Sequence, residues 1–429
     1  MSQIIPSGKE TNQKTYSIAV DPGFHGFKVV INGMYFFIPR AIVMNDVSLN
    51  DVFSGILDTN RDDFICYNTI SDNYYVGAVA YDSSQSVNQV AKSNSTDNMY
   101  IKPEFFLTKE FNIALQTVIG YAIYRYNKEV LNMPYNVHNE VNIDVQDNIE
   151  LILALPHSYC DQYGPVISQA QAKSHEFMLI TGKQQINANI SYTILPNKVS
   201  VISQTVAAVL CKILSDDSSI AELEKVLPTV IIDGGYLTTG LLSLDTALKA
   251  NYLTDESNLH FTTNTINLAV EKDILTTTGR RDITSYGVDK FIRNEPKIRY
   301  RSEESKKTEI YDIEQKKKDI IDDMSKEFIE YLDNKYSNLV AYKSIHIAGG
   351  TGILFAEYLK NYYVDETSTF DNDQVIMVQG KNYNPSNDIH KIDPDKKTIT
   401  VGYTIDDDYS ASFGVAIGAY RVLKSEAAE

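Results

Sequence analysis

Three segments of the chain join an apolar strand to a glycine-rich turn, and two of them end the strand with an aspartate. Asp21 lies in the first segment (19–26) and Asp233 in the second (230–235), while the third turn follows a strand at 345–348. Glycine lets backbone N–H groups approach phosphate oxygens, and a carboxylate at a strand end can hold a hydrated Mg²⁺ beside them. One such turn is weak evidence, but three in this order predict a nucleotide bound from two sides.

Two aspartates and a lysine are the charged side chains expected at this site. Asp21 and Asp233 are predicted to order the waters around Mg²⁺ from opposite sides, the alternative being carboxylates that only cap their turns. Lys28 meets the β-phosphate as a point charge if it points into the cleft, and is otherwise a surface lysine. Gly23 and Gly26 permit close approach of the backbone in the first loop.

The composition is that of a soluble globular protein. With 429 residues, 43% hydrophobic and 22% charged, the chain is expected to form roughly two to four domains. It has no membrane-spanning apolar run, no signal-peptide pattern, and three scattered cysteines, which predicts a reducing cytoplasm and argues against a zinc site. The net charge of −17 predicts repulsion of nucleic acid and anionic lipid, so work on DNA would require a basic partner.

Apolar spacing predicts an alternation of strands and helices in the first half of the chain. Strands are expected at 16–20, 27–31, 35–38 and 151–155, and helices at 105–126 and 203–214. The pair Asn32-Gly33 is a strong hairpin signal, because the favoured two-residue turn needs positive φ at both positions. Ser203 is a candidate N-cap of the second helix. The chain is therefore expected to open as a β-meander.

The second half repeats this order as a weak internal duplication, with one meander per half. A strand, a glycine turn and a second strand are expected at 227–244, a further strand at 345–348, and helices at 353–362 and 412–423. Residues 287–335 are predicted to be mostly helical, and their interleaved charges favour a solvated face over a nucleic-acid patch. Gly414 and Gly418, four residues apart, indicate close packing of the last helix against a sheet.

Five short motifs occur in a recognisable order along the chain. They are Asp21 with Lys28 seven residues later, Pro-Arg-Ala-Ile at 39–42, Tyr-Tyr-Val-Gly-x-x-Ala at 74–80, Asp233-Gly234-Gly235 with Thr238-Thr239, and Ile-Ala-Gly-Gly-Thr-Gly at 347–352. Together they resemble the superfamily of actins, sugar kinases and heat-shock-chaperone ATPases. More narrowly, they are similar to the bacterial plasmid-segregation actins of the ParM or StbA type.

The resemblance implies an actin-like α/β fold, in which two duplicated β-meander and helix domains surround a nucleotide cleft and each carries a smaller subdomain. The first domain is expected at 15–200, with a peripheral subdomain at about 40–104 and the C-terminal helix 405–429 added to it. The second is expected at 201–404, with a subdomain at about 245–310, and residues 1–14 are expected to be a flexible tail.

The resemblance also implies roles for single residues. Phe24, followed by His25, stands where the family usually has a Ser or Thr in the first phosphate loop, so a hydroxyl contact to the γ-phosphate is expected to be missing there and backbone N–H groups to remain. The alternative is that His25 serves as a polar substitute. Gln204 matches the residue that orients the attacking water; the alternative is a helix-terminal glutamine bonded to backbone. Asp21 and Asp233 would complete the catalytic set. Further nucleotide contacts are expected from Gly234, Gly235, Thr238 or Thr239, Lys317 or Lys318, Gly349, Gly350, Thr351 and Gly352.

The function implied is a cytoplasmic Mg-dependent ATPase, with GTP as the alternative nucleotide, that polymerises with itself head to tail. A basic DNA-binding adaptor on a plasmid centromere would link the filament to its cargo, with no direct contact to nucleic acid or membrane. The rivals are a metabolite kinase, a divisome or cell-shape actin, and a chaperone-type ATPase. The sequence offers no convincing acceptor site, no terminal amphipathic helix, and only about ten residues after Gly418 for a substrate-binding domain.

Overall fold

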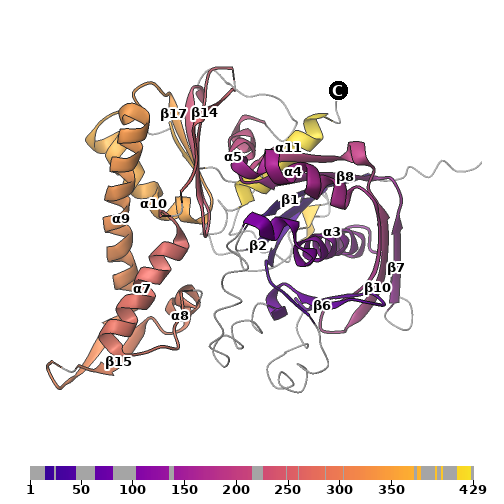
Figure 1. The fold of residues 1–429 in the computed structure, drawn as a ribbon, viewed down its shortest axis with the longest axis horizontal. Helices are drawn as coiled ribbons and strands as arrows, with labels where there is room; N and C mark the ends of the chain where they lie inside the picture. The colour runs from indigo at the N-terminus through magenta and orange to yellow at the C-terminus, as the bar shows by residue number, and fades with distance from the viewer. Residues whose placement is uncertain are drawn as a thin grey trace, which may run out of the picture.

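The structure, a computed structural model, consists of two α/β domains that lie side by side (Figure 1). It describes residues 15–23, 26–44, 63–80, 103–134, 140–214, 226–247, 249–258, 260–285, 287–302, 304–371, 374–377, 392–393, 398–399 and 413–426. Several predictions fall outside these ranges. They are the tail 1–14, Phe24 and His25 of the first loop, and the parts 45–62 and 81–102 of the predicted peripheral subdomain.

The first domain is built on a five-stranded sheet in the order β11–β8–β1–β2–β3. Its strands are β1 (Tyr16–Pro22), β2 (Gly26–Ile31), β3 (Met34–Pro39), β8 (Ile149–Leu155) and β11 (Val199–Ser203). β1, β2 and β3 form the predicted antiparallel meander, and β8 runs parallel to both β1 and β11. Asn32 (φ 45°) and Gly33 (φ 88°) adopt the left-handed conformations that the hairpin turn requires.

The second domain repeats this sheet in the order β14–β13–β12–β17–β18. Its strands are β12 (Thr229–Gly234), β13 (Thr239–Leu244), β14 (Ala250–Asn258), β17 (Ser344–Ala348) and β18 (Val375–Met377). The meander is again antiparallel, and β17 runs parallel to β12 and β18. Because the order and the strand directions are the same in both sheets, the predicted duplication is confirmed.

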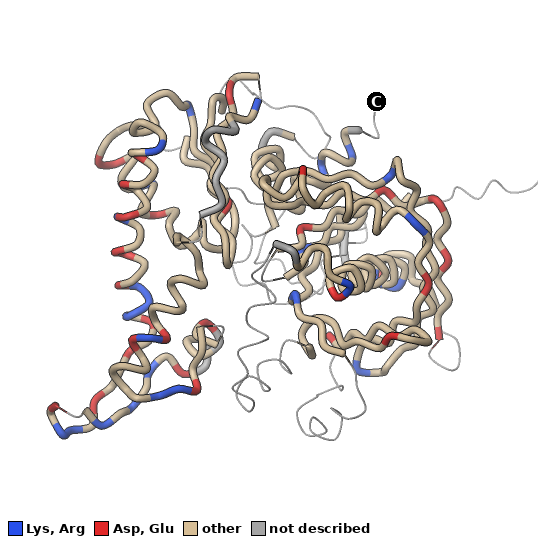
Figure 2. The backbone as a smooth tube through the Cα atoms, viewed as in Figure 1, with Lys and Arg blue, Asp and Glu red and all other residues tan. Residues whose placement is uncertain are grey.

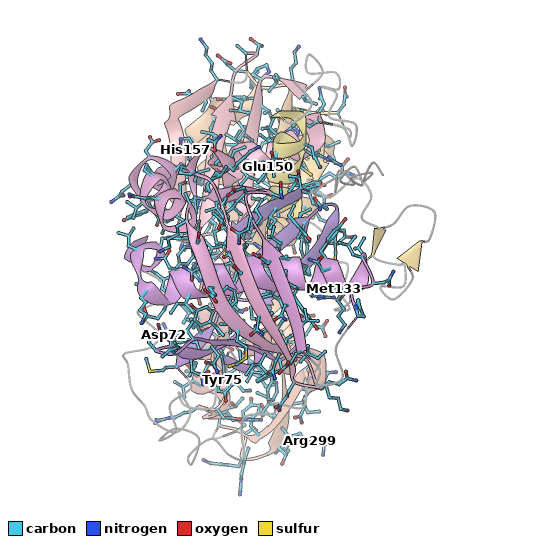
Figure 3. The ribbon with its side chains drawn as sticks, turned by 90° about the vertical axis from the view of Figure 1, so that its right-hand side faces the viewer. Asp72, Tyr75, Met133, Glu150, His157 and Arg299 are labelled. Carbon is cyan, nitrogen blue, oxygen red and sulfur yellow. The ribbon has the colours of Figure 1, made fainter. Side chains whose placement is uncertain are left out.

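A second sheet of the first domain has six strands in the order β4–β6–β5–β9–β10–β7. They are β4 (Ile42–Met44), β5 (Ile65–Asn68), β6 (Asn73–Val76), β7 (Glu140–Val145), β9 (Ser174–Thr181) and β10 (Ile186–Thr193). β5 pairs with β9, so the strands of the predicted peripheral subdomain join strands far along the chain in one continuous sheet. Figure 3 faces the outer side of this sheet, with Asp72 and Tyr75 near its lower end.

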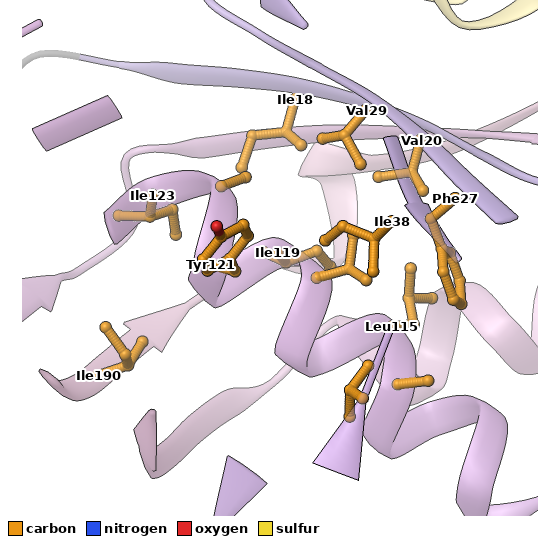
Figure 4. Close-up of a cluster of buried hydrophobic side chains, with 14 of the residues drawn as sticks. Ile18, Val20, Phe27, Val29, Ile38, Leu115, Ile119, Tyr121, Ile123 and Ile190 are labelled. Atoms are coloured by element: carbon orange, nitrogen blue, oxygen red, sulfur yellow. The ribbon is translucent and has the colours of Figure 1, made fainter. Parts of the chain in front are cut away.

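Helix α3 (Lys109–Glu129) lies between the two sheets of the first domain (Figure 1). Leu115, Ile119 and Ile123 of α3 pack with Ile18 and other side chains of β1 and β2 in one buried cluster (Figure 4). A helix covered on both sides must be apolar around most of its circumference, which explains its continuous apolar run. The sequence predicted one helix from residue 105, but a separate 3-10 turn (Pro103–Leu107) precedes Thr108, which caps α3 by accepting from the N–H of Phe111.

The two domains are joined by a shared core around α5 (Gln204–Ile213) and α11 (Gly414–Glu426). This core takes apolar side chains from both sheets and both helices, among them Ala19, Ile152, Ala207, Ile231, Leu242 and Ala416. A Cβ at Gly418 would overlap the carbonyl group of Ala207, so α11 approaches α5 backbone to backbone. Ser203 stands at the N-cap position of α5, but its hydroxyl contacts that of Thr205 at 2.8 Å and caps no backbone N–H.

The remaining described elements belong to both domains, with α4 and one 3-10 turn in the first. They are α4 (His157–Gln171), α7 (Thr263–Thr278), α8 (Val288–Asn294), β15 (Lys297–Arg301), β16 (Thr308–Asp312), α9 (Ile313–Tyr336), α10 (Gly350–Lys360), a π-helix (Asn361–Glu366), β19 (Ile392–Asp393), β20 (Thr398–Ile399) and 3-10 turns at Pro196–Lys198 and Ser337–Leu339. Region 287–335 was predicted to be mostly helical, yet it contains the β15–β16 hairpin. In the described part of the chain, no helix is both long and apolar enough to cross a membrane.

Candidate functional site

A cavity of about 630 Å³ lies where the ends of both meanders meet, and this volume is typical of a small-molecule site. The predicted site residues on its wall are Asp21, Gly23, Lys28, Gln204, Asp233, Gly235, Thr238, Lys317, Gly349, Gly350 and Thr351, with the alternative Lys318. Gly26, Gly234, Thr239 and Gly352 are not part of that wall. The cavity therefore brings together residues from three turns that are far apart in the sequence.

Asp21 is the centre of a polar cluster in the first domain. It is 1% exposed at the end of β1, directly opposite Lys28 in the antiparallel pairing with β2. Residues opposite each other in such a pair share one face of the sheet. The ammonium of Lys28 donates to Oδ2 of Asp21 at 2.9 Å, and Nε2 of Gln204 donates to Oδ1 at 2.6 Å. Both oxygens of this carboxylate are thus engaged by donors.

The hydrogen bond to Asp21 determines which way the amide of Gln204 points. An ionised carboxylate can only accept, so the NH₂ group of Gln204 must face Asp21 and its carbonyl oxygen Oε1 must face elsewhere. Gln204 is the first residue of α5 and lines the cavity. The side chain therefore bonds to a carboxylate rather than to backbone, and its carbonyl oxygen takes no part in that bond.

Asp233 approaches the same cavity from the second domain. It lies at the end of β12, where it pairs with Gly240 of β13. Burial, followed by the negative charge of Asp21, raises the pKa of Asp233 to about 7, although Lys28 lowers it. The two aspartates are thus close enough to repel each other, and one lysine offsets only part of their charge.

This charge distribution bears on whether the site fits Mg²⁺. The described residues contain no cluster of three or more His, Cys, Asp or Glu side chains that could hold a metal ion by themselves. Mg²⁺ is ordinarily bound through one or two carboxylates, retained waters and the phosphates of a substrate. Asp21 and Asp233 carry more negative charge than Lys28 offsets, and a divalent cation would offset the remainder. The site therefore fits a hydrated Mg²⁺ that arrives with phosphate groups.

The second and third glycine turns pack backbone against backbone. A Cβ at Gly349 (φ 80°) would overlap the carbonyl oxygen of Gly234 and lie 2.9 Å from Oδ1 of Asp233. A Cβ at Gly234 would overlap the backbone nitrogen of Gly352. By contrast, a Cβ at Gly350 would have no neighbour within 4 Å. Since α10 begins at Gly350, the N–H groups of its first turn lie at the cavity, where they favour an anion.

The threonines of these turns have distinct positions. Thr351 donates to the carbonyl oxygen of Gly235 at 2.5 Å and contacts the hydroxyl of Thr263 at 2.7 Å, which ties α10 to the second turn and to α7. Thr238 lines the cavity. Thr239 is fully buried and donates to the carbonyl oxygen of Phe261. Of the two candidates for a γ-phosphate contact, the structure places Thr238 at the cavity and Thr239 in the core.

The other end of the cavity is formed by α8, α9 and α10, where apolar side chains lie among charged ones. Ile292, Ile321 and Leu354 line it together with Tyr358, whose hydroxyl donates to Asp322. Lys317 also lies here and forms an ion pair with Asp289 of α8. The sequence predicted Lys317 as a nucleotide contact but did not predict Ile292, Ile321, Leu354 or Tyr358 at the cavity. Ile321 follows Lys317 by four residues and so shares its face of α9, a spacing that could have indicated it.

Comparisons with known proteins give a consistent picture of the fold. By sequence, the chain matches no protein-family model and no curated protein. Among solved structures it is similar to the actin-like protein Alp7A, with 14% identity, a TM-score of 0.60, and 96% of this chain and 97% of that chain covered. It is also similar to ParM from Clostridium botulinum, seen as a 15-stranded filament, with 15% identity, a TM-score of 0.56, and 96% and 99% covered.

A third similar structure is ParM from Bacillus thuringiensis with ATP, with 14% identity, a TM-score of 0.55, and 97% of this chain and 100% of that chain covered. In each case nearly the whole of both chains is superposed, so the likeness covers both meander domains rather than one shared motif. The duplicated sheets, the cavity between them and these comparisons lead to one conclusion: the chain has the actin-like ATPase fold.

Proposed function

We propose that this chain is a Mg-dependent ATPase that polymerises head to tail into nucleotide-dependent filaments and moves plasmid DNA through a basic DNA-binding adaptor. The observation that carries the proposal is the arrangement around one cavity. Asp21 and Lys28 from the first domain and Gln204 at the start of α5 lie opposite Asp233 and two packed glycine turns from the second domain. The likeness in fold to ParM with ATP and to ParM in a filament supports it.

The nucleotide has a natural orientation in this cavity. Its phosphates suit the end with the glycine turns, the first turn of α10 and the ammonium of Lys28, because all of these present N–H donors to anionic oxygens. Thr238 supplies a hydroxyl at the same end. The base of the nucleotide suits the apolar side chains of Ile292, Ile321 and Leu354 at the end formed by α8, α9 and α10. ATP is the proposed nucleotide, with GTP as the alternative.

Hydrolysis in this site would depend on the positioning of one water molecule. The amide nitrogen of Gln204 bonds to Asp21, and in this proposal its carbonyl oxygen accepts a hydrogen bond from that water and holds it in line with the γ-phosphate. An amide takes up no proton at neutral pH, so Gln204 orients the nucleophile and does not act as a base. When bound, Mg²⁺ supplies positive charge beside the phosphates.

Filament formation follows from the same site if the two domains close on the nucleotide. A head-to-tail contact joins two different surfaces and therefore continues without closing into a ring. A subunit affinity of about 1 μM corresponds to about −8 kcal/mol. Loss of the γ-phosphate needs to weaken this by only about 1–3 kcal/mol to make the polymer unstable. The net charge of −17 suits a basic adaptor as the link to DNA.

Right-angle light scattering on addition of Mg-ATP tests this function. The expected trace rises above a critical concentration and decays as phosphate is released. Asp233→Ala is expected to abolish the rise, whereas Asp144→Ala, at an exposed position on β7, is expected to leave it unchanged. A flat wild-type trace with steady ATP consumption would favour a metabolite kinase or another non-filamentous ATPase. A rise that Asp233→Ala does not alter would refute the proposed nucleotide site.

A further inference from the structure

The end of the cavity formed by α8, α9 and α10 contains an ion pair that has no role in the proposed hydrolysis. Lys317 extends from α9 and its ammonium contacts Oδ1 of Asp289 on α8. Both side chains line the cavity, where that of Lys317 is 13% exposed and that of Asp289 is 39% exposed. The lysine is therefore mostly enclosed, and the aspartate lies nearer the surface.

Asp289 is itself held in place by a buried residue. Its second oxygen, Oδ2, accepts a hydrogen bond of 3.0 Å from Nδ2 of Asn267 on α7, and Asn267 is 0% exposed. With one oxygen bonded to a fixed amide, the carboxylate presents the other to Lys317 in a defined direction. A free lysine side chain samples many rotamers, so this anchoring reduces the cost of ordering the ammonium.

The position of Lys317 determines which part of a nucleotide it can meet. Ile292, Ile321 and Leu354 suit a flat, largely apolar base, while the glycine turns at the other end suit the phosphates. Purine ring nitrogens and ribose oxygens are hydrogen-bond acceptors, and an ammonium is a donor only. A lysine fixed at this end is thus matched to the base and ribose and not to the phosphate chain.

We propose that Asp289 is a positioning residue of the nucleotide site, which holds Lys317 so that its ammonium donates to acceptor atoms of the base or ribose. This inference rests on the proposed function, because it assumes that the cavity binds a nucleoside triphosphate. Asp289 acts through Lys317, because one of its oxygens contacts that ammonium while the other accepts from Asn267.

Calorimetric titration with three ligands tests the proposal: ATP, ADP and inorganic tripolyphosphate, which has neither base nor ribose. Asp289→Asn keeps an oxygen for the amide of Asn267 but turns an NH₂ group toward Lys317, so it removes only the ion pair. We expect this variant to raise the Kd of ATP and ADP about tenfold and to leave the Kd of tripolyphosphate within about twofold. Combined with Lys317→Gln, it should weaken ATP binding no further than Lys317→Gln alone.

The adjacent ion pair on α9 provides a matched control. Lys316 contacts Asp273 of α7 at 3.2 Å, the two side chains are 37% and 32% exposed, and neither lines the cavity. Asp273→Asn is therefore expected to leave all three Kd values within about twofold. An Asp289→Asn variant that binds ATP normally, or that loses tripolyphosphate as strongly as ATP, would overturn the proposal. If the wild-type protein binds no nucleotide, both the proposed function and the role proposed for Asp289 fail. That result is distinct from the two Asp289→Asn outcomes, which would overturn the role of Asp289 alone.

Discussion

At the scale of single residues, the hydrogen bond between Gln204 and Asp21 assigns different partners to the two ends of the Gln204 amide. The amide nitrogen is committed to the carboxylate, so only the carbonyl oxygen is available to orient a water molecule. The same carboxylate is held by Lys28 on its other oxygen. Any substitution at Gln204 therefore has to satisfy Asp21 as well as the water.

For Gln204→Ala we expect ATP turnover to fall about a hundredfold, with the Kd of ATP changed by less than about threefold, because the residue orients the nucleophile and not the nucleotide. Gln204→Glu should not restore turnover, since it places a carboxylate against the oxygen of Asp21 that now accepts at 2.6 Å. Single-turnover phosphate release measures both variants. Wild-type turnover in Gln204→Glu would contradict the orientation inferred for the amide.

Asp233 makes the nucleotide-free protein sensitive to pH. Its pKa is raised from 3.8 to about 7 by burial first and by Asp21 second. As the pH rises through this window, the carboxyl ionises in the unfolded chain while it keeps its proton in the folded protein, so folding stability falls. Asp233→Asn has no such proton to lose. Its free energy of unfolding relative to wild type should therefore increase across the window, by at most about 4 kcal/mol.

Urea unfolding of both proteins, at about pH 5 and about pH 8 without nucleotide or Mg²⁺, checks this expectation. The difference between variant and wild type isolates Asp233, because every other titrating group is common to the two proteins. Equal differences at the two pH values would show that the carboxyl ionises in the folded protein as it does in the unfolded chain.

At the scale of elements, the sequence predicted what depends on local pattern. The meander at 16–38 followed from β-strand spacing and from Asn32-Gly33, and the structure has both. The β15–β16 hairpin was missed, although Ile298 is buried opposite Tyr311 and lies between the exposed Lys297 and Arg299. This strand shows period-two alternation, but the density of Lys, Arg, Asp and Glu in the region favours a solvated helical face.

In the candidate site, too, the residues marked by local sequence pattern were predicted and those that depend on tertiary packing were not. Asp21, Asp233 and the glycine turns are marked by their own neighbours in sequence and reach the cavity as expected. The choice between Thr238 and Thr239 was left open, because the turn before them is one residue longer than usual, and the structure begins β13 at Thr239, whose side chain is buried. Asp289 was missed because its position at the cavity depends on how α8 packs on α9, which no local motif records.

The contact between the glycine turns gives a prediction with its control one residue away. Gly349→Ala adds a methyl group where the carbonyl oxygen of Gly234 lies, at a φ of 80°, and should destabilise the protein by about 2–4 kcal/mol. Gly350→Ala meets no atom within 4 Å and should leave the unfolding free energy within about 0.5 kcal/mol. Thermal and urea unfolding without nucleotide measure both; equal losses would mean that the turns do not pack as described.

At the scale of the whole molecule, charge is unevenly distributed along the second domain (Figure 2). The β15–β16 hairpin carries exposed cations at one end: Lys297, Arg299, Arg301, Lys306 and Lys307. Exposed acidic residues follow α9 and the π-helix away from it: Asp319, Asp323, Glu327, Glu330, Asp365 and Glu366. A chain of net charge −17 that concentrates cations on one projecting hairpin has different electrostatic surfaces at its two ends. Such an asymmetry suits a head-to-tail contact, which needs two different complementary surfaces.

Charge reversal on the hairpin tests whether this asymmetry contributes to assembly. Arg301→Glu should raise the critical concentration for polymerisation with Mg-ATP about tenfold, equivalent to about 1.4 kcal/mol of subunit affinity. Added salt should raise the wild-type critical concentration and reduce the difference in critical concentration between Arg301→Glu and the wild type. The reason is that exposed charges are screened beyond about 10 Å at 0.1 M ionic strength.

Lys183→Glu serves as the control, since it makes the same change in net charge at an exposed turn between β9 and β10 of the other domain. Sedimentation of polymer over a range of protein concentrations measures all three proteins. If the two variants raise the critical concentration equally, the effect comes from net charge alone.

The hairpin is part of the subunit contact only if Arg301→Glu acts more strongly than Lys183→Glu and both variants hydrolyse ATP below the critical concentration at the wild-type rate. That second condition matters because the hairpin leads directly into α9, which carries Lys317 to the nucleotide cavity. A variant that slowed the monomer would have acted through the site and not through the contact.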